Sequence, residues 1–256
     1  MLLDIHAHLD HVQFKEDLPE VIERAKKVMI VASGITPKTN RFVLSLSKKY
    51  ENVKASVGLY PIEAFKAEIK QGDYPISPEK IDIEDEIEFI KKNRDEIVAI
   101  GEIGLDYSLV PETERQQKEL FQKLISLAEK IKKPIIVHSR KAEQDVIEML
   151  ESSSLKKIIL HCFCGNKKLV NRAQDNGWYL TVPTNVVRSQ QMQFIAGTTD
   201  INKILTETDS PYLSPFPGKR NEPSFVIEAV KKIAEIKKMD IIEVENNIFK
   251  NYLSVT

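Results

Sequence analysis

The chain has 256 residues with a formal net charge of −1, and 42% of its residues are hydrophobic. This length is enough for one large domain with a substantial core, and we expect residues 1–256 to form a single domain. The balanced charge excludes a general attraction to nucleic acid, so any polyanion must be bound locally. No apolar run approaches the roughly 20 residues of a membrane helix, and residues 1–10 lack the pattern of a signal peptide. With two cysteines, a disulfide framework is excluded, and the cytoplasm is the expected compartment.

Short apolar runs alternate with amphipathic segments along the chain. In order, the runs predict strands over residues 2–8, 28–34, 53–59, 97–101, 134–138, 157–161, 178–182 and 203–206. The amphipathic segments predict helices over residues 17–27, 38–50, 82–93, 113–133, 141–150, 166–176, 223–238 and 240–252. Residues 60–80 carry three prolines and are predicted to form a long loop with room for one helical turn.

Several of the apolar runs are continuous, which is typical of parallel strands covered on both faces. About eight βα units in a chain of this length fit a closed (β/α)8 barrel of the TIM type. The alternative is an open doubly wound sheet, which usually has a glycine-rich phosphate loop after its first strand. Here the first apolar run ends in HAHLDH, so the barrel is the favoured fold.

Histidines and carboxylates end five of the predicted strands. Active sites of parallel barrels are built at the C-terminal ends of the strands. His6 and His8 end the first strand and share one of its faces, because strand side chains alternate. The fourth, fifth, sixth and eighth strands end in Glu102, His138, His161 and Asp209.

This set predicts a metal centre. Neutral imidazole and carboxylate are suitable ligands for zinc, manganese, iron and similar divalent ions. Six ligands exceed the four of one tetrahedral site and suit two ions, roughly 3.5–4 Å apart, that share a bridging carboxylate. Glu102 lies centrally in the chain order and is the expected bridge. We expect two divalent ions and leave Mg²⁺, Mn²⁺ and Zn²⁺ open.

Four residues near the predicted ligands are not expected to bind the metal ions themselves. His11 lies past the first strand and is expected to line a loop. Asp4 either orients His6 or caps a turn. Cys162 and Cys164 are expected to be small buried side chains rather than ligands for a soft metal.

Several stretches carry a family resemblance: DIHAHLD, AIGEIGLDY, KPIIVHSRKA, ILHCFCG and ETDSPYLSPFPGKRNEP. In their order, spacing and local text, the chain resembles the TatD family of metal-dependent deoxyribonucleases, from residue 2 to the NNIFKNYL segment. The resemblance implies a TIM-type barrel of the amidohydrolase-like class, a divalent metal centre and hydrolysis of phosphodiester bonds. It also implies that one ion is held by His6, His8, Glu102 and Asp209, and the second by Glu102, His138 and His161.

One stretch departs from the family. After the third strand the family often reads Gly-x-His-Pro-His, whereas this chain reads GLYPIE, with Tyr60 and Ile62 in place of the histidines. The first of these histidines usually lies near the substrate phosphate. We therefore expect the metal site to persist and the phosphate contact to change. Tyr60 is expected either to donate a hydrogen bond to the substrate or to pack as an aromatic residue.

Other polar residues are predicted substrate contacts. Arg140 follows His138 by two residues, and the cluster after the eighth strand contains Lys219, Arg220 and Asn221. The alternative for this cluster is a solvated loop. Catalysis is expected to use a metal-activated water, with Asp209 accepting its proton.

The expected activity is that of a 3′-to-5′ exonuclease on single-stranded DNA or RNA. A nearly neutral enzyme is better suited to a few terminal nucleotides than to a long duplex. The alternative activity uses the same metal site to hydrolyse a different bond, as in an ester or amide hydrolase such as a D-aminoacyl-tRNA deacylase. A third possibility is a non-catalytic binding role, and the intact ligand set argues against it. We expect nucleic acid ends as the substrate, no membrane association, no protein partner and a monomer.

Overall fold

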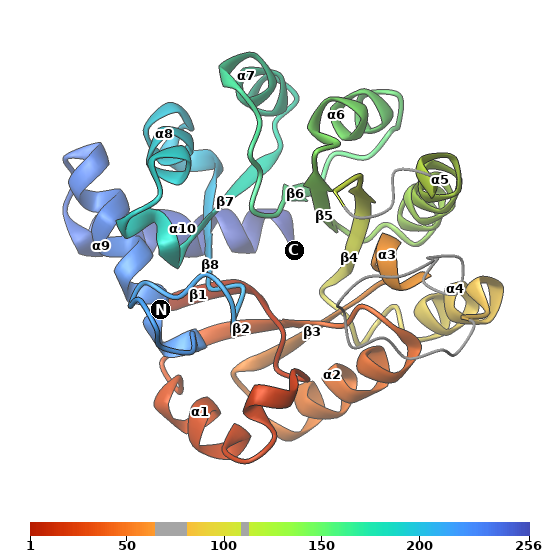
Figure 1. Ribbon diagram of the computed structural model, residues 1–256, viewed down its shortest axis with the longest axis horizontal. Helices are drawn as coiled ribbons and strands as arrows, with labels where there is room; N and C mark the ends of the chain where they lie inside the picture. The colour runs from red at the N-terminus through yellow and green to blue at the C-terminus, as the bar shows by residue number, and fades with distance from the viewer. Residues whose placement is uncertain (65–80, 109–112) are drawn as a thin grey trace.

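The computed structural model describes residues 1–64, 81–108 and 113–256. It shows one parallel sheet of eight strands, hydrogen-bonded in sequence order from β1 to β8. The helices lie around the outside of these strands (Figure 1). The strands are β1 (Leu2–Ala7), β2 (Val28–Ser33), β3 (Val53–Val57), β4 (Ala99–Asp106), β5 (Ile135–Arg140), β6 (Ile158–Leu160), β7 (Tyr179–Pro183) and β8 (Ile204–Glu207).

The helices alternate with the strands, as the sequence predicts for this barrel. None of the helices in the described ranges is both long enough and apolar enough to cross a membrane. The described α-helices are α1 (Leu18–Arg24), α2 (Pro37–Lys49), α3 (Pro61–Ala64), α4 (Ile83–Lys92), α5 (Glu114–Ile131), α6 (Glu143–Glu151), α7 (Lys167–Asp175), α8 (Gln190–Thr198), α9 (Val226–Lys237) and α10 (Ile241–Val255).

The ring closes where β8 meets β1. Ala7 and Ser210 form an isolated parallel bridge just past the end of β8. The backbone N–H of His8 donates to the carbonyl of Ser210 at 2.8 Å, and the Thr206 hydroxyl donates to the carbonyl of Leu3 at 2.6 Å. These contacts join the first and last strands, and they confirm the predicted (β/α)8 fold.

Burial on both faces explains the continuous apolar runs. All eight residues of β4 are buried, and so are all residues of β6 and β8. The largest fully buried side chains include Trp178, Phe121 and Phe163. The polar site at the strand ends is therefore supported by a closely packed interior.

Two elements differ from the sequence prediction. Strand β4 runs to Asp106, five residues past the predicted end, because Glu102, Gly104 and Asp106 interrupt its hydrophobic pattern without ending the strand. Helix α8 was not predicted, since it buries only Met192, Ile195 and Ala196 and offers a short apolar stripe.

The predicted loop over residues 60–80 is described only in its first part. Helix α3 (Pro61–Ala64) is the single helical turn expected there. Residues 65–80 lie outside the described residues, so the rest of that prediction stays a prediction.

Candidate metal centre

The six predicted ligands come together at the C-terminal end of the barrel. Three lie within strands, and three lie one or two residues past the end of a strand. Five of them are no more than 9% exposed, and the Asp209 side chain is 14% exposed. The ligands within strands are His6 in β1, Glu102 in β4 and His138 in β5, and those after strands are His8, His161 and Asp209.

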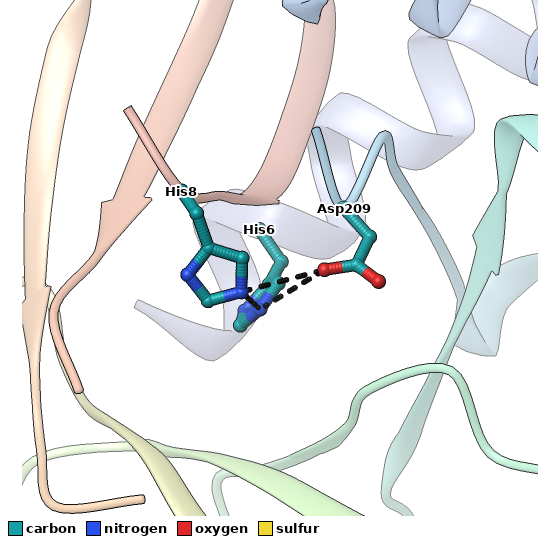
Figure 2. A group of neighbouring side chains, drawn as sticks. All are labelled: His6, His8 and Asp209. Atoms are coloured by element: carbon teal, nitrogen blue, oxygen red, sulfur yellow. Dashed lines mark hydrogen bonds and ion pairs between the residues drawn. The ribbon is translucent and has the colours of Figure 1, made fainter. Parts of the chain in front are cut away.

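One group of donor atoms lies close together, with one atom each from His6, His8 and Asp209 within 4.8 Å of one another. The Nε2 atoms of His6 and His8 are 3.2 Å apart. Asp209 Oδ1 is 3.7 Å from the first of these atoms and 3.4 Å from the second. Glu102 Oε2 is 3.4 and 3.6 Å from the same two nitrogens. Figure 2 shows the two imidazoles and Asp209 converging.

These spacings fit one bound ion. Ligands about 2.0–2.2 Å from a tetrahedral zinc-like ion are roughly 3.3–3.6 Å from one another. The separations among His6, His8 and Asp209, which are 3.2–3.7 Å, span that range. The donor set of imidazole and carboxylate also suits zinc or manganese.

A second group shares Glu102. Its other oxygen, Oε1, lies 2.9 Å from His138 Nδ1 and 3.8 Å from His161 Nε2. The rings of His6 and His161 stack with their centroids 3.9 Å apart, which brings the two groups side by side. The two oxygens of Glu102 therefore face different sets of histidines, as a bridging carboxylate would.

Three of the histidines are held from behind by residues that the sequence did not point out. A metal-ligating imidazole usually bonds through its other nitrogen to a carboxylate, hydroxyl or carbonyl, which fixes its tautomer and orientation. Two of these partners are carboxylates, Asp106 and Glu207. They lie in AIGEIGLDY and ETDSPYLSPFPGKRNEP, two of the stretches that carry the family resemblance, and this position was their only signal in the sequence. The pairs are His6 Nδ1 with Ser33 Oγ (2.9 Å), His138 Nε2 with Asp106 Oδ2 (3.0 Å) and His161 Nδ1 with Glu207 Oε2 (2.8 Å).

Both carboxylate ligands are held in the ionised form. Burial alone would raise the pKa of Glu102, but the neighbouring His6 and His138 outweigh it and hold that pKa well below its ordinary value. Burial likewise works against ionisation of Asp209, and His8 outweighs it, so the pKa of Asp209 is lowered. Ionised oxygens are the form that binds a cation.

The carboxylates also raise the pKa of two imidazoles. Burial would lower the pKa of His161, but Glu207 outweighs it and raises that pKa to about 10. In the same way burial is outweighed at His8, where Asp209 raises the pKa to about 9. Without a cation the carboxylates thus hold protons on these rings. A divalent ion would take the place of those protons, so the residues fit a metal centre.

Asp4 joins two strands. Its Oδ1 accepts from the backbone N–H of His6 at 3.3 Å and from that of Thr208 at 2.8 Å. Its Oδ2 accepts from the Thr208 hydroxyl. Burial raises the pKa of Asp4 to about 8. Asp4 therefore fastens β1 to the segment after β8, and the contact with His6 is made to the backbone and not to the ring.

Tyr60 supports a ligand. Its hydroxyl donates to Asp106 Oδ2 at 2.7 Å, and its ring meets that of His138 edge-on with centroids 5.0 Å apart. Burial and the charge of Glu102 raise the pKa of Tyr60, so the hydroxyl keeps its proton. The same hydroxyl lies 3.4 Å from His138 Nε2, so the tyrosine contacts both Asp106 and the predicted ligand that Asp106 holds. Ile62, the other departure from the family pattern, is buried.

The predicted cationic contacts divide into two kinds. Arg140 is exposed at the end of β5 and lines a cavity of about 150 Å³ together with His161 and Asp209. Lys219 is exposed, and its ammonium lies 5.7 Å from the centre of the Phe216 ring. Arg140 therefore faces the cavity, whereas Lys219 faces solvent beside Phe216.

The other two residues of the cluster bind the protein itself. Arg220 donates to both oxygens of Asp17, at 2.7 and 2.6 Å, which pins the loop to the start of α1. Asn221 is fully buried, and its amide donates to the Thr184 hydroxyl at 2.9 Å. Further donations reach the carbonyls of Thr208 and Tyr212. In this arrangement Arg220 and Asn221 shape the loop.

The remaining candidates lie beside the centre. His11 accepts from the backbone N–H of Gln13 at 3.2 Å in the loop after β1, as expected. The prediction of two buried cysteines is wrong for Cys164, which is exposed, and Cys162 is only partly buried. Both line the cavity, because the chain turns away from β6 immediately after His161.

Comparisons with known proteins show the family to which the chain is similar. Residues 3–256 match the model of the family described as TatD related DNase. An "Uncharacterized metal-dependent hydrolase" of Methanocaldococcus jannaschii is 37% identical over 97% of this chain and 94% of its own length. The human "Deoxyribonuclease TATDN3" is 30% identical over 99% of this chain and 94% of its own length.

Solved structures agree on the fold. The crystal structure of YJJV, a TatD homologue from Escherichia coli, superposes with a TM-score of 0.87 at 22% identity, covering 99% of this chain and 97% of that one. A family match across nearly the whole chain and relatives of similar length lead to one conclusion. The chain belongs to the TatD family of metal-dependent hydrolases.

Proposed function

We propose that this protein is a 3′-to-5′ exonuclease that hydrolyses phosphodiester bonds at the ends of single-stranded DNA or RNA with two divalent ions. The observation that carries the proposal is the position of Glu102, whose two oxygens face two separate groups of ligand atoms. The printed name of the human relative, a deoxyribonuclease, supports a nucleic acid substrate.

The proposed chemistry uses few side chains. When bound, the two ions would lower the pKa of a water molecule and offset charge on the phosphoryl oxygens. The carboxylate of Asp209 lines the cavity and is held ionised, so it is suited to accept the proton of the attacking water. Arg140 lines the same cavity and is suited to bind a phosphate oxygen.

The test is cleavage of single-stranded DNA labelled at its 5′ end. Metal-free protein is incubated with Mg²⁺, Mn²⁺ or Zn²⁺ in turn, beside Glu102→Ala and Asp209→Asn. We expect a ladder of shortened products that needs a metal and that both variants lose. Asp175→Asn, an exposed carboxylate change at the end of α7, is the matched control and should leave the ladder unchanged.

Two other results of this test would contradict the proposed nuclease activity or the metal centre. A protein that binds two ions but leaves DNA and RNA intact would shift the proposal to an ester or amide hydrolase. A panel that includes a D-aminoacyl-tRNA would then identify the bond. A protein that binds neither ion would contradict the metal centre itself.

A further inference from the structure

The cavity at the metal centre is too small for a whole nucleotide. Its volume is about 150 Å³, and its lining includes His138, Arg140, His161 and Asp209. Pockets that enclose drug-sized ligands usually measure roughly 300–1,000 Å³. A phosphate group fits among these residues, whereas the attached sugar and base must lie outside, against the rim.

The rim next to Asp209 presents apolar surface. Tyr212 is 49% exposed and Val12 is 73% exposed, in the segments that follow β8 and β1. The ring of Tyr212 lies edge-on to two histidines, with its centroid 6.3 Å from that of His8 and 5.4 Å from that of His11. An exposed aromatic ring therefore lies beside the predicted ligand His8, and the next residue in the chain, Leu213, lines the cavity.

The backbone of Tyr212 is fixed relative to Asp209. The Tyr212 N–H donates to the Asp209 carbonyl at 2.9 Å. The buried amide of Asn221 donates to the carbonyls of Tyr212 at 2.7 Å and of Thr208 at 2.8 Å. A side chain mounted on a fixed backbone loses little further freedom when a ligand binds.

Phe216 is a weaker candidate on the same loop. It is 38% exposed, but its ring packs edge-to-face against Phe225 at 5.1 Å. The Lys219 ammonium lies over it at 5.7 Å, so a base would have to displace that charge. Among the described residues, the other exposed aromatic side chains of comparable size, Phe42 and Phe194, lie on α2 and α8.

We propose that Tyr212, with His11 beside it, is the surface on which a nucleobase of the substrate stacks while its phosphate lies in the cavity. This inference rests on the proposed function, because it presumes a nucleic acid substrate. Every base has an aromatic face, so stacking tolerates all sequences. A nucleotide without a base has nothing to place on the ring.

The experiment measures kcat/KM for two single-stranded DNAs labelled at the 5′ end. One has ordinary nucleotides at its 3′ end, and the other has abasic tetrahydrofuran nucleotides at the same positions. We expect Tyr212→Ala to lower kcat/KM about tenfold on the ordinary DNA, the usual scale for one lost stacking contact. Tyr212→Ala should change kcat/KM on the abasic DNA little, and Tyr212→Phe should keep the wild-type kcat/KM on both DNAs. Phe194→Ala, an exposed aromatic change on α8, is the matched control.

Each other result contradicts the stacking surface. Equal kcat/KM values for Tyr212→Ala and the wild-type protein on ordinary DNA would show that the Tyr212 ring does not contribute to substrate binding or cleavage. Equal losses on both DNAs would show that Tyr212 acts on the site and not on the base, and thermal unfolding with metal would show whether the variant is still folded. Cleavage of neither DNA by the wild-type protein would refute the proposed function and the stacking surface together.

Discussion

Single side chains behind two of the predicted ligands decide which ring nitrogen faces Glu102. His138 turns Nδ1 toward Glu102 because its Nε2 is held by Asp106, whereas His161 turns Nε2 because its Nδ1 is held by Glu207. Two histidines on adjacent strands thus present different atoms. Asp106 and Glu207 set this difference, because each binds the opposite ring nitrogen of its histidine.

The contact between Glu207 and His161 gives a direct test. Glu207→Gln keeps the shape of the side chain but removes the charge that orients the imidazole. We expect the affinity for one of the two ions to fall about 10- to 100-fold, as is typical when such a partner is lost. Calorimetric titration of metal-free protein with Mn²⁺ measures both sites. Glu151→Gln, on the outer helix α6, is the control, and unchanged affinities in Glu207→Gln would contradict this role.

Among the elements, β4 carries the most unusual backbone. Its pairing with β5 shifts register between Ile100 and Ile103, around Glu102. Such irregularities re-aim side chains and are common beside active sites. Gly104 then pairs with His138 at a φ of +139°. A Cβ at this glycine would lie 2.1 Å from the carbonyl oxygen of His138, so no other residue fits.

Gly104→Ala is therefore expected to be strongly destabilising. The unusual φ alone costs about 1–3 kcal/mol, and the overlap with β5 adds to it. We expect the free energy of unfolding to fall by more than about 2 kcal/mol in urea titration. Gly197→Ala in α8 is the matched control, because its Cβ would meet only Ile236 at 3.7 Å. It should be neutral or stabilising by up to about 1 kcal/mol.

Helix α1 is tied to the segment after β8 by an ion pair. Arg24 donates to Glu222 at 2.7 and 3.0 Å, and the Glu222 side chain is 8% exposed. Burial would raise the pKa of Glu222, but Arg24 outweighs it and lowers that pKa. A lowered carboxyl pKa stabilises the fold above the unfolded value of about 4.3 and loses that effect as the pH falls through the folded value.

The corresponding variant is Glu222→Gln. At pH 7 we expect its free energy of unfolding to be lower than that of the wild-type protein by about 1–2 kcal/mol. The difference should shrink below about pH 4, where the wild-type carboxylate takes up its proton. Urea unfolding of both proteins at a series of pH values measures this, with Glu23→Gln as an exposed control. A difference that stays constant with pH would contradict the assignment.

Across the molecule, the predicted metal centre would link strands from all around the barrel. Its ligands come from β1, β4, β5 and the segments after β1, β6 and β8. The unfolded chain cannot hold them together, so bound ions stabilise the folded state by mass action.

Metal binding should accordingly raise the unfolding temperature. At an ion concentration of 100 times Kd, the stabilisation is about 2.7 kcal/mol per site. For a protein of this size that corresponds to roughly 5–10 °C. Differential scanning calorimetry of metal-free protein with and without Mn²⁺ measures the shift, and Glu102→Ala should lose it. An equal shift in that variant would show that the ions bind elsewhere.

The barrel and its six candidate ligands could be predicted from the sequence alone. Apolar runs, amphipathic helices and the polar residues that end each strand are local features, and in a parallel barrel all strand ends meet at one mouth. That rule was enough to bring His6 and Asp209 together across 203 positions of the chain.

The pairing of the polar groups could not be predicted in this way, because it depends on how distant segments meet in the folded chain. Glu207 and Asp106 lie beside predicted ligands, but which imidazole nitrogen each one holds depends on distances between strands. Arg220 was a predicted substrate contact, and it is paired with Asp17, 203 positions away. Asn221 is buried under the loop that carries Tyr212. Local sequence carries the type of each side chain, whereas its partner is set by how the loops pack over the barrel.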